Sequence, residues 1–283
     1  MPSQDITIDI PGLSLAAKVW GPSEGRPVLA CHGWLDNAAS FDRLAPMLEG
    51  LRIVAIDFPG HGRSEHRPPG TTYHFIDWVP VYFDVADSLG WERFSLMCHS
   101  MGAAVATLAA GTYPERIERM VLIDGLGPWT TPAAQAPEQL QKALDERKVL
   151  SEKSPRTFAS PEAVASVVSE IHSVSPQNAR LLVDRGVEQN DDGQWEFSYD
   201  LTLRGASHMR LTEEQVMGFL RRIECATLLV RPENGWPADP QQIKQRMAAI
   251  ASLESVSVPG NHHVHLDHPE RMASNIQSFF DAS

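Results

Sequence analysis

The sequence has few cysteines, an excess of acidic over basic residues, and no long hydrophobic run, and each of these features excludes a class of protein. Among 283 residues, Lys and Arg number 24 and Asp and Glu number 36, which gives a net charge of -12. No run rich in lysine and arginine stands out. Nucleic-acid binding depends on clustered basic side chains, so it is not expected. An anionic membrane surface would repel such a chain as well.

The sequence also lacks segments typical of secretion or of membrane spanning. The first residues, MPSQDITIDIPG, contain no basic segment followed by an apolar core. Nowhere do about 18 apolar residues follow one another, the length that a spanning helix needs. We therefore expect a cytoplasmic protein.

The three cysteines, Cys31, Cys98 and Cys225, are odd in number and far apart in the sequence. Each lies in an apolar, strand-like run. This setting favours buried thiols in a reducing compartment over disulfides or a zinc site.

The order of hydrophobic patterns predicts an α/β fold. Short apolar and β-branched runs alternate with longer amphipathic stretches, which is typical of a mostly parallel sheet flanked by helices. About eight strands are predicted, at residues 6–10, 15–20, 27–31, 52–57, 93–97, 119–124, 226–231 and 254–258. Helices are expected at residues 37–49, 73–89, 100–113, 241–251 and 269–280.

One interval breaks this alternation. From about residue 127 to 222 the buried-strand pattern is lost and the chain becomes helical and charged. Such a length is too great for a strand-to-helix connection. We therefore predict a core of residues 1–126 and 223–283, with a mainly helical cap, residues 127–222, inserted after the sixth strand.

The pentapeptide Cys98-His99-Ser100-Met101-Gly102 joins an apolar run to an alanine-rich helical run. A serine at a sharp strand-to-helix corner is a candidate nucleophile, because the corner exposes its hydroxyl and small neighbours let strand and helix approach closely. Gly102 is one small neighbour, and Cys98 stands where glycine is usual in the Gly-x-Ser-x-Gly pattern. An ordinary loop serine is the alternative interpretation.

A serine nucleophile needs a base that can take its proton. His262 is the best candidate, because it follows the last predicted strand, at the sheet edge where ligands gather in open α/β sheets. The nearby His263, His265 and His268 could instead bind a metal. We expect no metal there, since apart from Asp267 no carboxylate or cysteine cluster lies close by in the sequence.

Acyl transfer also requires two fixed donors for the developing oxyanion. The backbone N–H groups of Met101 and Trp34 are predicted for this role, and the ring of His32 is expected to brace the loop that carries Trp34. Asp57 and Arg63, in a glycine-containing loop after the fourth strand, are interpreted as structural.

Together these motifs resemble the α/β-hydrolase superfamily. They are VLACHGWLDN (28–37), DFPGHGRS (57–64), CHSMG (98–102) and VPGNHHVHLDHPE (258–270), and they span nearly the whole chain in the superfamily's order. More narrowly, HGWLDNAASFDRL, DLTLRGASHMRLTEEQ (200–215) and VPGNHHVHLDHP resemble the serine hydrolase-like proteins. The resemblance implies a serine triad and no cofactor.

The acid of that triad departs from the superfamily's common pattern. The aspartate usual after the seventh strand is replaced by Gly235, in Arg-Pro-Glu-Asn-Gly. Some dehalogenases of the superfamily carry the acid at the end of the sixth strand, where this chain has Asp124. Asp124 is therefore the preferred acid and Glu233 the alternative. A turn-capping role for Asp124 is also open.

The cap is expected to select the substrate. Phe41, Trp129, Arg204 and Arg210 are the candidate pocket residues, although core packing or local ion pairing would also explain them. The predicted function is hydrolysis of a small-molecule ester, thioester or similar acyl bond. Carbon–carbon bond hydrolysis, perhydrolysis and a non-catalytic binding or scaffold role on the same fold stay open, as does a homodimer.

Overall fold

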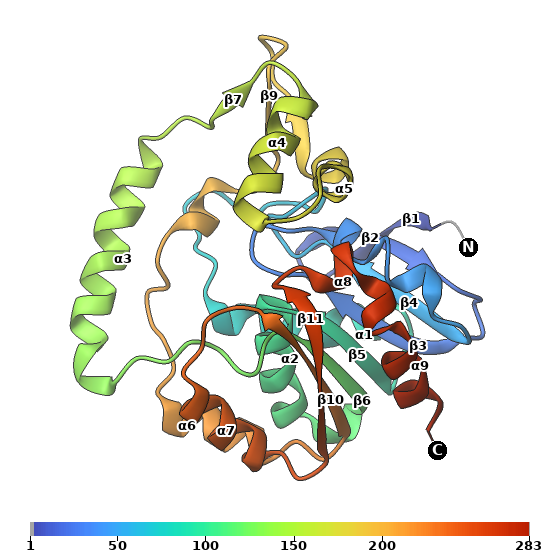
Figure 1. The fold of residues 1–283 in the computed structure, drawn as a ribbon. Helices are drawn as coiled ribbons and strands as arrows, with labels where there is room; N and C mark the ends of the chain where they lie inside the picture. Colours follow the sequence, from blue (N-terminus) through green and yellow to red (C-terminus); the bar gives the residue numbers. More distant parts are fainter. Residues whose placement is uncertain (1–2, 283) are drawn as a thin grey trace.

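A large sheet of eight strands runs through the computed structural model, which describes residues 3–282 (Figure 1). Its order is β1-β2-β4-β3-β5-β6-β10-β11. The strands are β1 Gln4–Ile10, β2 Leu13–Trp20, β3 Arg26–Cys31, β4 Leu51–Ile56, β5 Phe94–His99, β6 Ile117–Ile123, β10 Ala226–Asn234 and β11 Leu253–Asn261. β2 pairs antiparallel with β1 and β4, and the remaining neighbours are parallel. This arrangement confirms the predicted α/β-hydrolase sheet.

Helices cover both faces of this sheet, because alternate strand residues point to opposite sides. One face carries Leu29 and Leu96, which belong to the same buried cluster as α1 (Trp78–Ser88) and α2 (Met101–Thr112). The other face packs against α9 (Ala273–Asp281). Burial on both faces explains why these strands are continuous apolar runs in the sequence.

The segment expected to form one long helix at residues 37–49 instead forms two short 3₁₀ turns, η1 (Ala38–Phe41) and η2 (Ala45–Met47). Pro46 lies in the second turn and has no N–H to donate, which disfavours a continuous helix. At the first turn, the Asn37 side chain accepts a hydrogen bond from the Ala39 N–H. The helix prediction is therefore wrong here.

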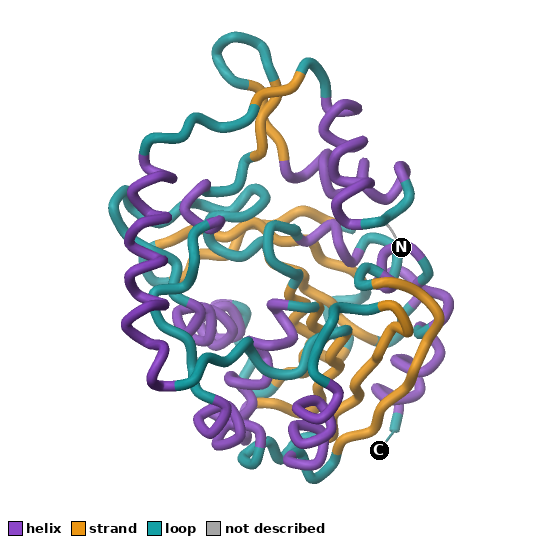
Figure 2. Tube along the Cα trace, turned by 60° about the vertical axis from the view of Figure 1, so that its left-hand side comes forward, coloured by secondary structure: helices purple, strands orange, loops and turns teal. Residues whose placement is uncertain are grey.

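The interval between β6 and β10 contains both helices and a second, three-stranded sheet. Its helices are α3 Ala136–Ser151, α4 Pro161–His172, α5 Pro176–Gly186 and α6 Glu213–Leu220, with the 3₁₀ turn η6 at Leu201–Arg204. The strands β7 (Thr157–Phe158), β8 (Val187–Gln189) and β9 (Trp195–Phe197) pair antiparallel in the order β7-β9-β8. Figure 2 shows this small sheet lying apart from the large one.

The last helix of the interval packs against the core. Val216 and Leu220 of α6 belong to the same buried cluster as α2. Gly111 of α2 allows the close approach, since a Cβ at this position would lie 2.4 Å from the carbonyl oxygen of Phe219. By its contacts, α6 therefore joins the core face, although it falls inside the range 127–222 that was predicted as cap.

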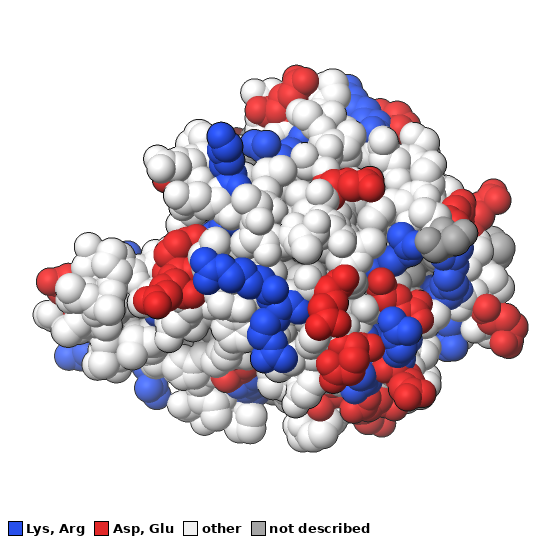
Figure 3. All heavy atoms as spheres, turned by 90° about the horizontal axis from the view of Figure 1, so that it is seen from below, with Lys and Arg blue, Asp and Glu red and all other residues white. Residues whose placement is uncertain are grey.

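The surface of the molecule carries charges of both signs. On the face shown in Figure 3, basic side chains occur in short groups bordered by acidic ones. Within residues 3–282, none of the helices combines the length and the apolar character that crossing a bilayer requires.

Candidate active site

Ser100 lies at the sharp corner between β5 and α2. Its backbone has φ 50° and ψ -114°, a conformation that a non-glycine residue adopts only when its surroundings hold it there. Its N–H donates to the carbonyl of Ile123 at the end of β6, over 3.0 Å. The corner therefore projects the Ser100 hydroxyl from the carboxyl edge of the sheet.

Small residues are required on either side of this corner. A Cβ on Gly102 would lie 2.4 Å from the carbonyl oxygen of Cys31, and one on Gly125 would lie 2.6 Å from that of Ser100. Cys98 takes the place of the usual glycine. Its thiol is fully buried and lies 3.8 Å from the Tyr82 hydroxyl. The same hydroxyl donates to the Gly102 carbonyl over 2.7 Å. Burial raises the pKa of the neighbouring Cys31 thiol.

The side chains of Ser100, His262 and Asp124 form one continuous chain of hydrogen bonds. His262 Nε2 lies 2.8 Å from Ser100 Oγ, and His262 Nδ1 lies 2.5 Å from Asp124 Oδ2. His262 follows β11 and Asp124 follows β6, so both reach the serine from carboxyl ends of parallel strands. This is the relative arrangement of hydroxyl, imidazole and carboxylate that activates a serine.

The Asp124 carboxylate lies beside Gly235. A Cβ at Gly235 would lie 2.6 Å from each carboxylate oxygen of Asp124, so that carboxylate occupies the space beside the turn after β10. Asp124 itself has φ 47°, a left-handed conformation that aspartate tolerates better than most residues. Its Oδ2 also accepts a hydrogen bond from the Trp236 N–H, over 2.8 Å. The alternative acid, Glu233, is exposed near the end of β10.

The loop after β3 lies directly against the serine corner. A Cβ built on Gly33 would be 3.2 Å from Ser100 Cβ, and the Gly102 N–H donates to the carbonyl of His32 over 3.1 Å. Among the hydrogen bonds of residues 3–282, none uses the backbone N–H of Trp34 or of Met101 as donor. Neither N–H group therefore has an acceptor within residues 3–282.

His32 braces this loop. Its Nδ1–H donates to the Gly33 carbonyl over 2.7 Å, and its Nε2 accepts from the Phe58 N–H over 3.0 Å. Full burial lowers the pKa of His32 and keeps the ring neutral, the form in which one ring nitrogen donates and the other accepts.

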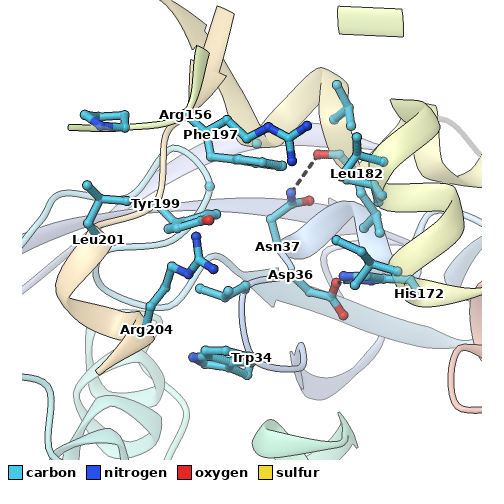
Figure 4. A pocket seen from close by; sticks show the side chains of 18 residues that line it. Trp34, Asp36, Asn37, Arg156, His172, Leu182, Phe197, Tyr199, Leu201 and Arg204 are labelled. Carbon is cyan, nitrogen blue, oxygen red and sulfur yellow. Dashed lines mark hydrogen bonds and ion pairs between the residues drawn. The ribbon is translucent and has the colours of Figure 1, made fainter. Parts of the chain in front are cut away.

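A cavity of about 270 Å³ lies between this loop and the inserted segment. Trp34 and Asp36 line it from the core, and residues of α4, α5, β9 and η6 line it from the insertion (Figure 4). Ser100 is not among its lining residues, whereas Trp34, next to the Gly33 that faces Ser100, is one of them. Its walls are mostly apolar, with Arg156 and Arg204 as the basic side chains.

The other three expected pocket residues lie elsewhere. Phe41 is fully buried in the core, where its ring lies 5.7 Å from that of His265, so it does not line the cavity. Trp129 is 61% exposed, with the Arg210 guanidinium 5.6 Å from its ring. The centroid of the Trp129 ring lies 5.7 Å from that of Trp236, and the Trp236 ring in turn lies 5.2 Å from that of His262. The two tryptophans therefore form an exposed aromatic surface beside His262, outside the cavity.

Asp57 is structural, and its main partner is a residue that the sequence did not single out. The carboxylate is fully buried and accepts from the Ala38 and Arg63 N–H groups. Arg185 of α5 donates its Nε–H to the same carboxylate at 2.9 Å. Nothing in the spacing of the two residues, 128 positions apart, indicates this pair.

Comparisons with known proteins agree with the architecture. Residues 26–169 match the family described as alpha/beta hydrolase fold. A serine hydrolase-like protein of Dictyostelium discoideum is 32% identical over 98% of this chain and 81% of its own length. A serine hydrolase-like protein of Danio rerio is 32% identical over 98% of this chain and 88% of its own.

Solved structures extend this similarity. A hypothetical protein of Pseudomonas aeruginosa PAO1 is 42% identical with a TM-score of 0.91, covering 98% of both chains. A thioesterase domain from the curacin biosynthetic pathway is 26% identical with a TM-score of 0.86, covering 98% of this chain and all of that one. The chain therefore belongs to the α/β-hydrolase superfamily, and within it to the branch most like the serine hydrolase-like proteins.

Proposed function

We propose that this chain is a serine hydrolase that cleaves an ester, thioester or similar acyl bond through an acyl-enzyme on Ser100. The observation that carries the proposal is the hydrogen-bonded chain from Ser100 Oγ through His262 to Asp124. The strained backbone of Ser100 supports it further, because such strain persists at residues that must present a reactive group.

The mechanism follows from the positions of these groups. His262 Nε2 takes the proton of the Ser100 hydroxyl as its oxygen attacks the acyl carbon, and Asp124 orients the ring and stabilises the imidazolium that forms. The Trp34 and Met101 N–H groups receive the oxyanion. His262 then protonates the leaving group, and a water molecule that it activates releases the acyl group from Ser100.

The cavity supports a substrate with an apolar acyl chain that ends in an anionic group. Arg156 and Arg204 line it, and no carboxylate of residues 3–282 lies within ion-pair distance of either side chain. Figure 4 shows both guanidinium groups directed inward, toward Asn37 and Tyr199. A guanidinium binds a carboxylate or phosphate through paired N–H donors, so these side chains fit such an end group. The relative from curacin biosynthesis is a thioesterase, which favours thioesters among the substrates to be tried.

A fluorophosphonate probe tests the nucleophile. The wild-type protein is expected to be labelled at Ser100, as located by mass spectrometry of the peptide, and Ser100→Ala is expected to remain unlabelled. A folded wild-type protein that ignores the probe would contradict the proposal and support the scaffold alternative.

Paired thioesters of equal chain length, one with a terminal carboxylate and one with a terminal methyl group, test the acyl end. Arg204→Ala is expected to lower kcat/KM by about 10-fold or more for the carboxylate substrate, roughly one charge-assisted hydrogen bond, and to leave the methyl substrate unchanged. Arg210→Ala is the matched control, because Arg210 lies over Trp129 outside the cavity. Equal losses on both substrates would contradict anion recognition by Arg204.

A further inference from the structure

Four side chains from distant parts of the chain converge in a buried group beside the serine corner. Asp36 follows β3, His99 ends β5, His172 ends α4 and His263 follows β11. We call these four residues the Asp36 cluster. The sequence expectation of no metal rested on the lack of a carboxylate near the histidines of residues 262–268, and the fold supplies Asp36 from 227 positions away.

The atoms that face one another in the Asp36 cluster are all able to donate a lone pair. His263 Nε2 lies 3.2 Å from Asp36 Oδ2 and 3.1 Å from His172 Nδ1. His172 Nδ1 lies 3.4 Å from Asp36 Oδ1, and His99 Nδ1 lies 3.8 Å from Asp36 Oδ2. The candidate ligand atoms of Asp36, His99 and His263 all lie within 4.8 Å of one another.

The protonation of His99 follows from its other contact. His99 Nε2 lies 2.9 Å from the backbone carbonyl of His262, which can only accept, so the hydrogen of a neutral ring is on Nε2. The lone pair of Nδ1 therefore points at the Asp36 carboxylate.

Three buried side-chain atoms of the cluster make no hydrogen bond, and His263 Nδ1 is one of them. His99 Nδ1 and Asp36 Oδ1 are both without a partner, although each is enclosed by protein. A lone pair facing a carboxylate across 3.8 Å is unfavourable unless a cation lies between them. The arrangement therefore indicates a positively charged ligand.

We propose that the Asp36 cluster is a binding site for a divalent transition metal, with Zn²⁺ as the best match. Zn²⁺ holds nitrogen and carboxylate ligands at about 2.0–2.1 Å in a tetrahedron, which sets its ligand atoms about 3.3 Å apart. The distances from Asp36 Oδ2 to His263 Nε2, 3.2 Å, and to His99 Nδ1, 3.8 Å, lie around that value. Two imidazoles and one carboxylate favour zinc over calcium or magnesium, which prefer oxygen ligands.

The surroundings of His99 match those of a metal-bound histidine. Such a ring generally donates its second N–H to a carboxylate or a backbone carbonyl, which fixes its orientation, and His99 donates to the carbonyl of His262. Asp36, His99 and His263 supply three ligand atoms, and His172 Nδ1, 3.1 Å from His263 Nε2, lies beside the fourth position. A bound metal would fasten His172, and with it the end of α4, to the loop after β3.

This inference does not depend on the proposed hydrolysis, and its test measures metal binding itself. The full-length protein is treated with a chelator, dialysed and titrated with Co²⁺, whose visible absorption reports a tetrahedral ligand field, and then with Zn²⁺ in competition. One metal per chain is expected, and Zn²⁺ should raise Tm with increasing concentration.

Variants locate the site. His172→Gln is expected to weaken Zn²⁺ binding by about 10–100-fold, because His172 contacts the ligands Asp36 and His263 and loss of a group that supports ligands costs about that much. His268→Gln is the control, since His268 lies in the same histidine-rich stretch but is exposed and contacts Glu270. Asp36→Asn should also lose binding. Should that variant fail to fold, His172→Gln decides, because His172 lies at the partly exposed end of α4.

Two results would overturn the inference. One is the absence of stoichiometric Co²⁺ or Zn²⁺ binding to the chelator-treated wild-type protein. The other is wild-type affinity in His172→Gln together with loss in His268→Gln, which would move the metal to the exposed histidines.

Discussion

Moving the triad acid from β6 to the turn after β10 tests the assignment of Asp124 most directly. In Asp124→Asn the His262 ring keeps a neighbour of the same shape but loses the negative charge that stabilises its cation. The expected loss is about 10⁴-fold in kcat, the scale measured when a triad aspartate becomes asparagine, or about 5 kcal/mol of transition-state stabilisation. The Glu233→Gln variant is expected to keep wild-type turnover.

The structure then predicts a rescue. Because a Cβ at Gly235 would lie 2.6 Å from the Asp124 oxygens, an aspartate at 235 can direct a carboxylate into the space that they occupy. The double variant Asp124→Gly, Gly235→Asp is therefore expected to recover at least about 100-fold of the activity lost in Asp124→Gly alone, because Asp–His contact is restored. Glycine also accepts the positive φ of position 124 without strain.

The single variant Gly235→Asp is the matched control. With Asp124 still present, the two side chains overlap and two carboxylates compete for His262, so both Tm and turnover are expected to fall. The assay is steady-state hydrolysis of a p-nitrophenyl ester, with circular dichroism to verify folding. A dead Glu233→Gln together with an active Asp124→Asn would refute the assignment, as would a folded double variant with no recovery.

Two further predictions concern stability. Arg185→Ala leaves the Asp57 carboxylate buried without its ion pair, so it is expected to lower the free energy of unfolding by about 3–5 kcal/mol in urea titrations. Arg180→Ala, on the exposed side of α5, is the control and should change this free energy by less than about 1 kcal/mol. Equal effects would contradict this. Burial, with the nearby His32, lowers the pKa of His61 to about 3, so between pH 6.5 and 3 the unfolded chain binds the proton and stability falls as the pH falls. At pH 5 the free energy of unfolding is expected to be about 2 kcal/mol lower than at neutral pH because of His61. In His61→Gln this part of the dependence of stability on pH should disappear. The same pH dependence in wild type and variant would contradict the prediction.

The sheet and the nucleophile corner were predictable because their signals are local. Each strand is a short apolar run, and the corner residues Ser100 and Gly102 are two positions apart. His262 could be named because the end of a parallel strand fixes the edge at which its loop emerges. Asp124 could be preferred from the sequence, but only the contact with Gly235 shows that its carboxylate has room beside the turn after β10.

The remaining features depend on contacts between distant residues. Arg185 shares the buried face of α5 with Leu182, but its partner Asp57 lies 128 positions away, and no sequence pattern indicates that contact. Phe41 was expected in the pocket, yet η1 directs it into the core. Asp36 and His99 showed no pattern of metal ligands, because their partners come from the ends of α4 and β11.

The ion pair between Arg185 and Asp57 has a consequence for how a substrate enters. It ties α5 to the rim of the sheet, so lifting this helix would separate two desolvated charges. By contrast, α3 buries a single side chain, Ala143, and runs apart from the rest of the insertion in Figure 1. Displacing α3 exposes little apolar area, so α3 should move more readily than α5, whose residues Leu182 and Val183 line the cavity.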